Sequence, residues 1–596
     1  MSFKRTALYP VNPITARGEG TKLSSSKDKI AYANGRTVII RDLKNPGADI
    51  AYSGHIQNAT VARISPSGYY CASGDSAGNI RVWDTVGEEQ VLKAEYRVIS
   101  GRVTDLDWDG ESKRIIAVGD GKERFGHAFM MDTGSSTGEI MGHSKVPNAV
   151  SIRQQRPYRA ATAGDDTTII FYQGPPYKYV KAIKTHTKFV QDVRYSPSGD
   201  HFVSVGSDAK VFLYDGKTGD TLAEVTDSPH SGTIYGASWS QDSKSFVTSA
   251  ADGTVKLWDV EARKATTTWT LGPGLSNQQV GNTWTAGDDI VSLSISGDLN
   301  IFDKRVGTNP ARVLQAPSKA VTSAISSRPG TFIAGTADGR VLSHDGESYK
   351  TIDGSGHSSY VVGITATSDG PVYSTGYDDQ VREIDLKGQS FVQASCPTAS
   401  QPKSIAVAKD QTVFVAEANA VEAIRSNQKV HELKPSFSPS SVAASGSIVA
   451  VGGEDQKVRL YDWDGKTLKE TAVLEGNKSV ISALAFSPDG SLLVSGETSG
   501  RVLLFDVKER KLITSRWSFH TARILSLAWT EDGQHCASGS LDTHVYIWSV
   551  KKPMKNISIK NAGTGGVSAV FWLSPMKLGS TGADGCVRVW DIVFHV

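Results

Sequence analysis

The segment AADGTVKLWD (250–259) contains the pattern that decides the fold. Small residues end one strand, Asp252 and Gly253 make a turn, and an alternating strand ends in Trp258 and Asp259. Alternation with a period of two between turn residues is typical of half-buried strands joined in hairpins. The same pattern recurs in GDSAGNIRVWD (74–84), GSDAKVFLYD (206–215), GEDQKVRLYD (453–462), GSLDTHVYIW (539–548) and GADGCVRVWD (582–591).

This repeat extends along the whole chain of 596 residues. The spacing of its final aromatic position is roughly forty residues, the length of one four-stranded propeller blade. Rings of four to eight blades are usual, so fourteen units predict an all-β protein with two seven-bladed β-propellers. The final positions are Arg41, Trp83, Met131, Tyr172, Tyr214, Trp258, Phe302, His344, Ile384, Ile424, Tyr461, Phe505, Trp548 and Trp590, several of which have lost the aromatic side chain.

The boundary between the two rings is predicted at DKRVGTNPARVL (303–314), where Arg, Gly, Asn and Pro interrupt the strand pattern. The chain continues for only six residues after Trp590, which leaves little length for an outer strand in the last blade. We therefore expect an N-terminal strand within KRTALYPV (4–11) to fill that place. The predicted division is an N-terminal segment 1–20, an N-terminal propeller 21–312 and a C-terminal propeller 313–596.

Histidine and aspartate recur at fixed distances from the final aromatic residue. Four histidines lie 28 residues before it, and aspartates lie six residues before it in several units. This resembles the WD-repeat family, in which His, Asp, a strand hydroxyl and Trp form a hydrogen-bonded set inside each blade. Buried imidazoles and carboxylates must be paired, so a structural role is predicted, and nothing in the spacing suggests a catalytic or metal site. The residues assigned to this role are His55, His186, His230, His520, Asp166, Asp208, Asp252, Asp542, Trp83, Trp258, Trp548 and Trp590.

Composition excludes several classes of function. The 64 basic and 62 acidic side chains nearly cancel and no long run of like charge occurs, so nucleic acid is not an expected partner. The start MSFKRTALYP has no apolar core of a signal peptide and no run of eighteen apolar residues occurs, so no membrane partner is expected. Four widely spaced cysteines indicate reduced thiols. No catalytic, nucleotide-binding or metal-binding motif is present, so we expect neither an enzyme nor a cofactor.

Two loops in the N-terminal half depart from the repeat. In AVGDGKERFGHAFMMDTGSS (117–136) a polar insert presents Glu123, Arg124 and Phe125. In DDTTIIFYQGPPYKY (165–179) two aspartates stand where a blade needs one; Asp166 lies six residues before Tyr172, so Asp165 is surplus and is expected in water near the loop apex. Exposed aromatic residues beside acids are typical of protein-binding surfaces. The alternative is that Tyr177, Tyr179 and Phe189 pack between blades.

The same segments resemble the actin-interacting protein 1 family. The likeness covers the whole chain and includes PSGYYCASGDSAGNIRVWDT (66–85), KRIIAVGDGKERFG (113–126), DDTTIIFYQGPPYKY (165–179), HTKFVQDVRYSP (186–197) and NQQVGNTW (277–284). The resemblance implies fourteen WD-type repeats and a monomeric, cytoplasmic protein of the actin cytoskeleton. It implies binding to actin filaments and ADF/cofilin, disassembly of cofilin-decorated filaments and restraint of regrowth at their ends.

In the family, acidic and aromatic residues of the N-terminal propeller support this activity. The matching positions are Glu123, Asp165, Tyr179 and Phe189. Many members have Phe where this sequence has Tyr177 and Tyr179, so the aromatic face is kept and hydroxyls are added. The alternative function is a WD-repeat scaffold or substrate receptor in a multiprotein complex, because a single WD unit does not identify a function.

Overall fold

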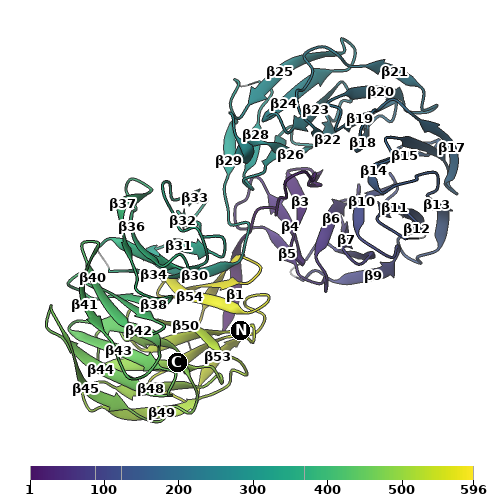
Figure 1. Cartoon of the computed structure of the whole chain (residues 1–596). Coiled ribbons are helices and arrows are strands. Elements are labelled where there is room, and N and C mark those ends of the chain that lie inside the picture. Colours follow the sequence, from purple (N-terminus) through teal and green to yellow (C-terminus); the bar gives the residue numbers. More distant parts are fainter. Residues whose placement is uncertain (1, 88, 123, 306, 368–369, 595–596) are drawn as a thin grey trace. The chain divides into compact units, whose positions relative to one another are not determined.

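The repeated pattern folds into four-stranded antiparallel sheets. The computed structural model describes residues 2–87, 89–122, 124–305, 307–367 and 370–594, and these residues form fourteen such sheets. They divide into two compact units: Asn12–Ser318, called the N-terminal unit, and Met1–Val11 with Lys319–Val596, called the C-terminal unit. With seven sheets each, arranged as a ring in Figure 1, the units are two seven-bladed β-propellers.

Each sheet of the N-terminal unit is built from four consecutive strands. One 3-10 helix, η1 (Leu275–Asn277), precedes the last sheet. The strands, sheet by sheet, are β2 (Ser24–Ser26), β3 (Lys29–Asn34), β4 (Thr37–Asp42), β5 (Ile50–Tyr52); β6 (Ala59–Ile64), β7 (Tyr70–Asp75), β8 (Asn79–Asp84), β9 (Leu92–Arg97); β10 (Val103–Trp108), β11 (Arg114–Gly119), β12 (Gly126–Met130), β13 (Ser136–Glu139); β14 (Pro147–Ile152), β15 (Arg159–Gly164), β16 (Ile169–Gln173), β17 (Lys178–Ile183); β18 (Val190–Tyr195), β19 (His201–Gly206), β20 (Val211–Asp215), β21 (Thr221–Glu224); β22 (Ile234–Trp239), β23 (Ser245–Ala250), β24 (Thr254–Asp259), β25 (Lys264–Thr270); and β26 (Gln279–Trp284), β27 (Ile290–Ser294), β28 (Leu299–Phe302), β29 (Arg312–Leu314).

The C-terminal unit has the same organisation in its first six sheets. Its strands are β30 (Val321–Arg328), β31 (Thr331–Thr336), β32 (Val341–His344), β33 (Tyr349–Thr351); β34 (Val361–Ala366), β35 (Val372–Gly376), β36 (Gln380–Asp385), β37 (Ser390–Pro397); β38 (Pro402–Val407), β39 (Val413–Glu417), β40 (Val421–Arg425), β41 (Gln428–Leu433); β42 (Pro439–Ser445), β43 (Ile448–Gly453), β44 (Val458–Trp463), β45 (Leu468–Leu474); β46 (Ile481–Phe486), β47 (Leu492–Glu497), β48 (Val502–Asp506), β49 (Lys511–Trp517); β50 (Ile524–Trp529), β51 (His535–Ser540), β52 (Val545–Ser549), β53 (Asn556–Ile559); and β54 (Val567–Ser574), β55 (Lys577–Gly582), β56 (Val587–Ile592).

The last sheet takes its outer strand from the other end of the chain. Strand β1 (Phe3–Tyr9) pairs antiparallel with β56, from Phe3 opposite Ile592 to Tyr9 opposite Val587. In Figure 1 this purple strand lies within the yellow sheet. Leu8 is buried, and the Phe3 ring meets the Trp590 ring edge-on at 6.0 Å between centroids. The N-terminal segment therefore completes the fourth position of this blade.

The boundaries between the units differ from those placed by the strand pattern. The chain passes from one unit to the other at Val11/Asn12 and at Ser318/Lys319, whereas the sequence placed the divisions after residues 20 and 312. A division after residue 312 would cut β29, which begins at Arg312 and pairs with β28 in the last N-terminal sheet. The segment 303–314 thus contains the turn that follows β28 and the whole of β29, all within one blade.

Hydrogen bonds between the first and last blades close each ring. In the N-terminal unit the Ser25 hydroxyl donates to the Trp284 carbonyl at 2.9 Å. In the C-terminal unit the Ser568 hydroxyl donates to the Val321 carbonyl at 2.6 Å. Because every blade has two neighbours, both faces of its second strand are covered: after its first residue, β15 is buried throughout, whereas most of the outer strand β17 is exposed.

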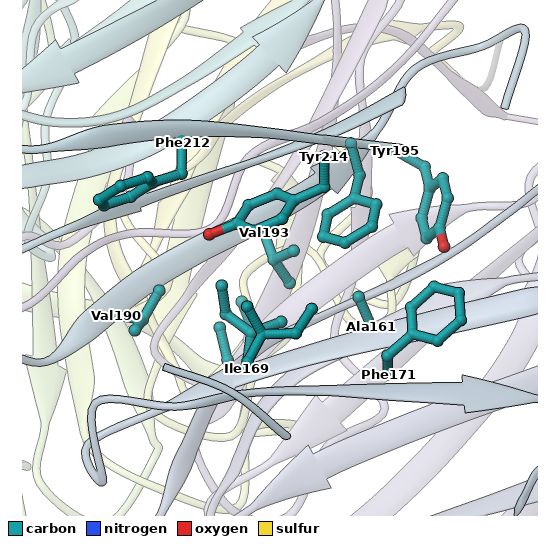
Figure 2. Close-up of a cluster of buried hydrophobic side chains, with 12 residues drawn as sticks. Ala161, Ile169, Phe171, Val190, Val193, Tyr195, Phe212 and Tyr214 are labelled. Atoms are coloured by element: carbon teal, nitrogen blue, oxygen red, sulfur yellow. The ribbon is translucent and has the colours of Figure 1, made fainter. Parts of the chain in front are cut away.

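The core consists of apolar clusters between neighbouring blades. Figure 2 shows the cluster between the β14–β17 and β18–β21 sheets, where Ile169 and Phe171 face Val193, Tyr195 and Tyr214. Burying side chains of this size contributes about 1.5–3 kcal/mol each. This cluster fixes the two blades that carry the candidate site.

One predicted repeat position is wrong by two residues. Met131 follows the end of β12, while Phe129 lies within it, opposite Ile115, and is buried. In other blades the register between the third and fourth strands shifts just before the final aromatic residue, and here that shift falls between Ala128 and Phe129. Phe129 is therefore the aromatic residue of this repeat. The polar insert lengthens the turn before it and so increases its distance in sequence from Trp83. Among the described residues, no helix combines the length and hydropathy needed to span a bilayer.

Candidate functional site

The polar insert and the Asp165–Asp166 turn lie at one end of neighbouring blades, whereas the GPPYKY turn between β16 and β17 lies at the other end. In an up-and-down sheet, the turn between the second and third strands lies at the same end as the connection arriving from the previous sheet. We call this the connection end. For the β14–β17 sheet it carries the β15–β16 turn with Asp165 and Asp166, and the connection 140–146. The connection 184–189 and the β11–β12 turn lie at the same end of the adjacent sheets.

Asp166 belongs to a buried hydrogen-bonded set. The His143 Nδ1 lies 3.0 Å from Asp166 Oδ2, and its Nε2 lies 2.7 Å from the Thr162 hydroxyl. The Tyr172 hydroxyl completes the set at 3.3 Å from that of Thr162. Burial alone would raise the pKa of Asp166, but hydrogen bonds from His143, Thr168 and the Ser144 amide outweigh it and hold the pKa below its usual range.

Other blades repeat this arrangement. In each, the histidine lies 2.6–2.8 Å from a strand hydroxyl, the Ser73, Ser204, Thr248 or Ser538 oxygen. Trp83, Trp258 and Trp548 donate their indole N–H to the strand hydroxyl of their own blade at 2.8–3.1 Å. Trp590 donates in the same way to the Ser580 hydroxyl at 2.8 Å. The pairs, given as the shortest side-chain distance, are His186–Asp208 at 3.0 Å, His230–Asp252 at 3.0 Å and His520–Asp542 at 2.9 Å. The histidine and tryptophan side chains are buried, and the paired carboxylates are at most 10% exposed.

Two histidines of this kind were missed by the spacing rule. His143 lies 29 residues before Tyr172, one more than the pattern used, and it is the partner of Asp166. His357 pairs with Asp378 at 2.8 Å in a blade whose aromatic position is Ile384. In the His55 blade the nearest carboxylate is Asp75, at 3.6 Å and eight residues before Trp83.

Asp165 is half-buried, not fully in water as expected. Its Oδ1 accepts a hydrogen bond of 2.7 Å from the Asn148 side chain, which also donates to the Val190 carbonyl at 3.1 Å. Its amide donates to the Val146 carbonyl at 2.9 Å. Asp165 thereby links the β15–β16 turn directly to the connection 140–146 and, through Asn148, to the start of β18 next to Phe189.

Phe189 is exposed at the connection end of the next blade. Its side chain is 46% accessible, and the Lys145 Nζ lies 5.9 Å from its ring centroid. The amide of Ser207 donates to its carbonyl at 2.8 Å, which fixes its backbone. The structure therefore brings Asp165, Lys145 and Phe189 into one neighbourhood.

The two tyrosines of GPPYKY have opposite surroundings. Tyr177 is 2% exposed and packs with Ile116, Ile140 and Tyr172 between blades, so for this residue the packing alternative is correct. Tyr179 is 51% exposed on β17. A Cβ at Gly142 would lie 3.0 Å from its ring, and Gly142 adopts a φ of 111°, which disfavours any other residue there. The segment 142–145 thus runs from the Tyr179 ring to Phe189.

Glu123, the fourth predicted site residue, lies outside the described residues. The insert that contains it joins β11 to β12, at the connection end of the neighbouring blade. Its following residue, Arg124, pairs with Glu139 at 3.2 Å, with both side chains exposed.

A cavity at the centre of the N-terminal unit is of a different kind. It has a volume of about 490 Å³ and is lined by the first strands of all seven blades. Lys22 pairs with Asp192 at 3.0 Å, and Asp105 pairs with Arg63 at 2.9 Å and Arg194 at 2.8 Å. Each of these charged side chains has a partner of opposite charge, so the ion pairs join different blades around the cavity. In the described part of the chain, no group of three or more His, Cys, Asp or Glu side chains is placed to hold a metal ion.

Comparison with known proteins gives two kinds of match. The family description "WD domain, G-beta repeat" matches residues 50–84, 177–215 and 223–259, and "Vps8 beta-propeller" matches residues 426–587.

Matches to individual proteins extend over the full length. The chain is 36% identical to actin-interacting protein 1 of Drosophila melanogaster, covering 99% of this chain and 98% of that protein. It is 37% identical to actin-interacting protein 1 of Caenorhabditis elegans, covering 99% and 100%, and 37% identical to WD repeat-containing protein 1 of Xenopus tropicalis, covering 100% of both. With this identity along its entire length, the chain belongs to the actin-interacting protein 1 family of WD-repeat proteins.

Proposed function

We propose that this protein binds actin filaments carrying ADF/cofilin, promotes their disassembly and restrains regrowth at filament ends. The observation that carries the proposal is the full-length identity of 36–37% to two proteins named actin-interacting protein 1. The protein acts as a monomer in the cytoplasm, on the actin cytoskeleton.

The connection end of the N-terminal unit, together with Tyr179 on the outer strand β17, supplies the contact surface in this proposal. Phe189 and Tyr179 expose about half of their side chains although neighbouring aromatic residues are buried. Asp165 keeps Oδ1 on Asn148, and its Oδ2 has no hydrogen-bond partner among the described residues. Exposed aromatic rings are among the side chains that contribute most to protein interfaces. Glu123 is assigned to the same surface.

Binding alone is sufficient for the proposed activity. A propeller pair that binds the cofilin-distorted filament more tightly than the undistorted one shifts the population toward the distorted state. The shift cannot exceed the difference in binding free energy between the two states, and about 1.4 kcal/mol changes the ratio tenfold. No bond of a substrate is broken, so no catalytic group is required.

Cosedimentation tests the proposal directly. Purified protein is pelleted with actin filaments in the presence and absence of cofilin, and the filaments remaining are measured in parallel. We expect more protein in the pellet and fewer filaments when cofilin is present. Pelleting that does not depend on cofilin would favour a general WD-repeat scaffold and would contradict the proposal.

A further inference from the structure

Three exposed lysines surround the candidate site without partners. Lys145 lies in the connection 140–146, and Lys184 and Lys188 lie in the connection 184–189. None of them has an ion-pair or hydrogen-bond partner among the described residues. By contrast, Lys181 on the neighbouring strand is paired with Asp220.

The aspartates of the two turns at this end are largely held by the fold. Asp166 is held by His143 and Asp208 by His186, with carboxylates 6% and 3% exposed. Asp165 gives its Oδ1 to Asn148 and keeps only its Oδ2 free. Three unpaired lysines beside this one half-engaged carboxylate leave an excess of positive charge among these residues, although the net charge of the whole chain is only +2.

The ammonium group of Lys145 lies next to the Phe189 ring. Its Nζ is 5.9 Å from the ring centroid, within the range of a cation–π contact. The result is an apolar centre at Phe189 with a cationic rim, and Tyr179 lies at the other end of the segment 142–145.

We propose that Lys145, Lys184, Lys188, Phe189 and Tyr179 form a basic-aromatic surface that binds an acidic segment of a protein partner bearing an exposed apolar side chain. This rests on the proposed function, in which that partner is the actin–cofilin filament. Charge complementarity selects the acidic segment, and the Phe189 ring selects an apolar side chain within it. Nucleic acid fits less well because the charged area is small and centred on an apolar ring.

Charge reversal tests this surface. The variant Lys145→Glu/Lys184→Glu/Lys188→Glu is compared with Lys27→Glu/Lys244→Glu/Lys264→Glu, which changes the net charge equally at exposed lysines from the opposite end of the sheets. We expect the first variant to weaken cosedimentation with cofilin-decorated filaments about tenfold or more and the control less than about twofold. Added salt is expected to weaken the binding of the wild type to the filaments. It should also reduce the difference in binding between the wild type and the first variant, because salt screens exposed charges. Equal loss in both variants would overturn the proposal.

A second readout separates this inference from the proposed function. Binding of the wild type and both variants to poly-L-glutamate and to duplex DNA is measured by fluorescence anisotropy, with unchanged melting temperatures as the check on folding. Poly-L-glutamate binding that is lost only in the first variant supports the surface even if no protein pellets with filaments. Absence of poly-L-glutamate binding, or preferential binding of DNA, would overturn the acidic-protein assignment.

Discussion

At the scale of single residues, the adjacent Asp165 and Asp166 allow structural and functional effects to be separated. Asp166→Ala removes the partner of buried His143 and is expected to lower the free energy of unfolding by about 1–3 kcal/mol. Asp165→Ala removes one hydrogen bond from Asn148 and is expected to cost about 0.5–1.5 kcal/mol while weakening filament disassembly. Denaturant unfolding and a filament disassembly assay measure the two effects.

Asp165→Asn is the matched control for this pair because its amide oxygen can still accept from Asn148. If the charge of Asp165 contacts the partner, this variant loses disassembly activity and keeps its stability. An Asp165→Ala protein that is destabilised as much as Asp166→Ala would refute the separation.

The His520–Asp542 pair predicts how stability responds to acid. Burial tends to raise the Asp542 pKa, but hydrogen bonds from His520 and the Thr521 amide dominate and lower it from 3.8 to about 2. A depressed pKa in the folded state stabilises the protein above the unfolded value and loses that contribution as pH falls through the folded value. We therefore expect about 2 kcal/mol to be lost between about pH 4 and pH 2.

Asp542→Asn removes this titration and checks the assignment. Its free energy of unfolding should be lower at neutral pH and should change less than that of the wild type between pH 4 and 2. Parallel curves for the two proteins would contradict the role of Asp542.

The repeat could be predicted at the residue level because its buried hydrogen bonds require particular side chains at particular distances. His186, His230 and His520 followed from spacing, since each partner lies in a turn of constant length. His143 did not, because the turn between β14 and β15 is one residue longer than the corresponding turn between β18 and β19. The partner of Asp165 could not be found from sequence either, because Asn148 approaches it only when the sheet forms.

At the scale of elements, the C-terminal blade depends on a strand from the chain start. Leu8→Ala in β1 is expected to destabilise the C-terminal unit by about 2–5 kcal/mol, because Leu8 is fully buried. Hydrogen exchange should then accelerate in β54–β56 and remain unchanged in the N-terminal unit. Lys4→Ala, at an exposed position of the same strand, is the control; equal acceleration in both variants would contradict this account.

The β38–β41 blade replaces the histidine–aspartate pair with two buried glutamates. Glu417 accepts from the Ser400 amide at 2.7 Å, and Glu422 pairs with Lys429. Burial, followed by the proximity of Glu422, raises the Glu417 pKa from 4.5 to about 7. A raised carboxyl pKa gives stability that is present below pH 4.5 and is lost as pH rises through about 7.

Glu417→Gln should therefore remove this loss of stability on the alkaline side. The wild type is expected to lose about 1–3 kcal/mol between about pH 5 and pH 8 relative to the variant. Denaturant unfolding curves across that pH range measure the free energy of unfolding of both proteins. Hydrogen exchange in β39 and β40 shows whether the change lies in this blade. A variant with the same pH dependence as the wild type would contradict the prediction.

At the scale of the whole molecule, the chain passes between the two units twice. The crossings are at Val11/Asn12 and Ser318/Lys319. Cleavage at a protease site inserted between Ser318 and Lys319 should leave the products associated, because β1 remains paired with β56. The cut protein should elute as one species in gel filtration and separate in denaturant. Uncut protein with the same insertion is the control, and release of a free C-terminal unit without denaturant would contradict the expectation.

The pairing of β1 with β56 also has a consequence for biosynthesis. The ribosome releases the seven blades of Asn12–Ser318 in order, so that ring can close while translation continues. The second ring cannot close until β56 emerges, and it then needs β1, which is made before the blades of the other ring. Strand β1 must therefore stay unpaired while those blades are made, and anything that captures it early would leave the final blade with an unpaired edge.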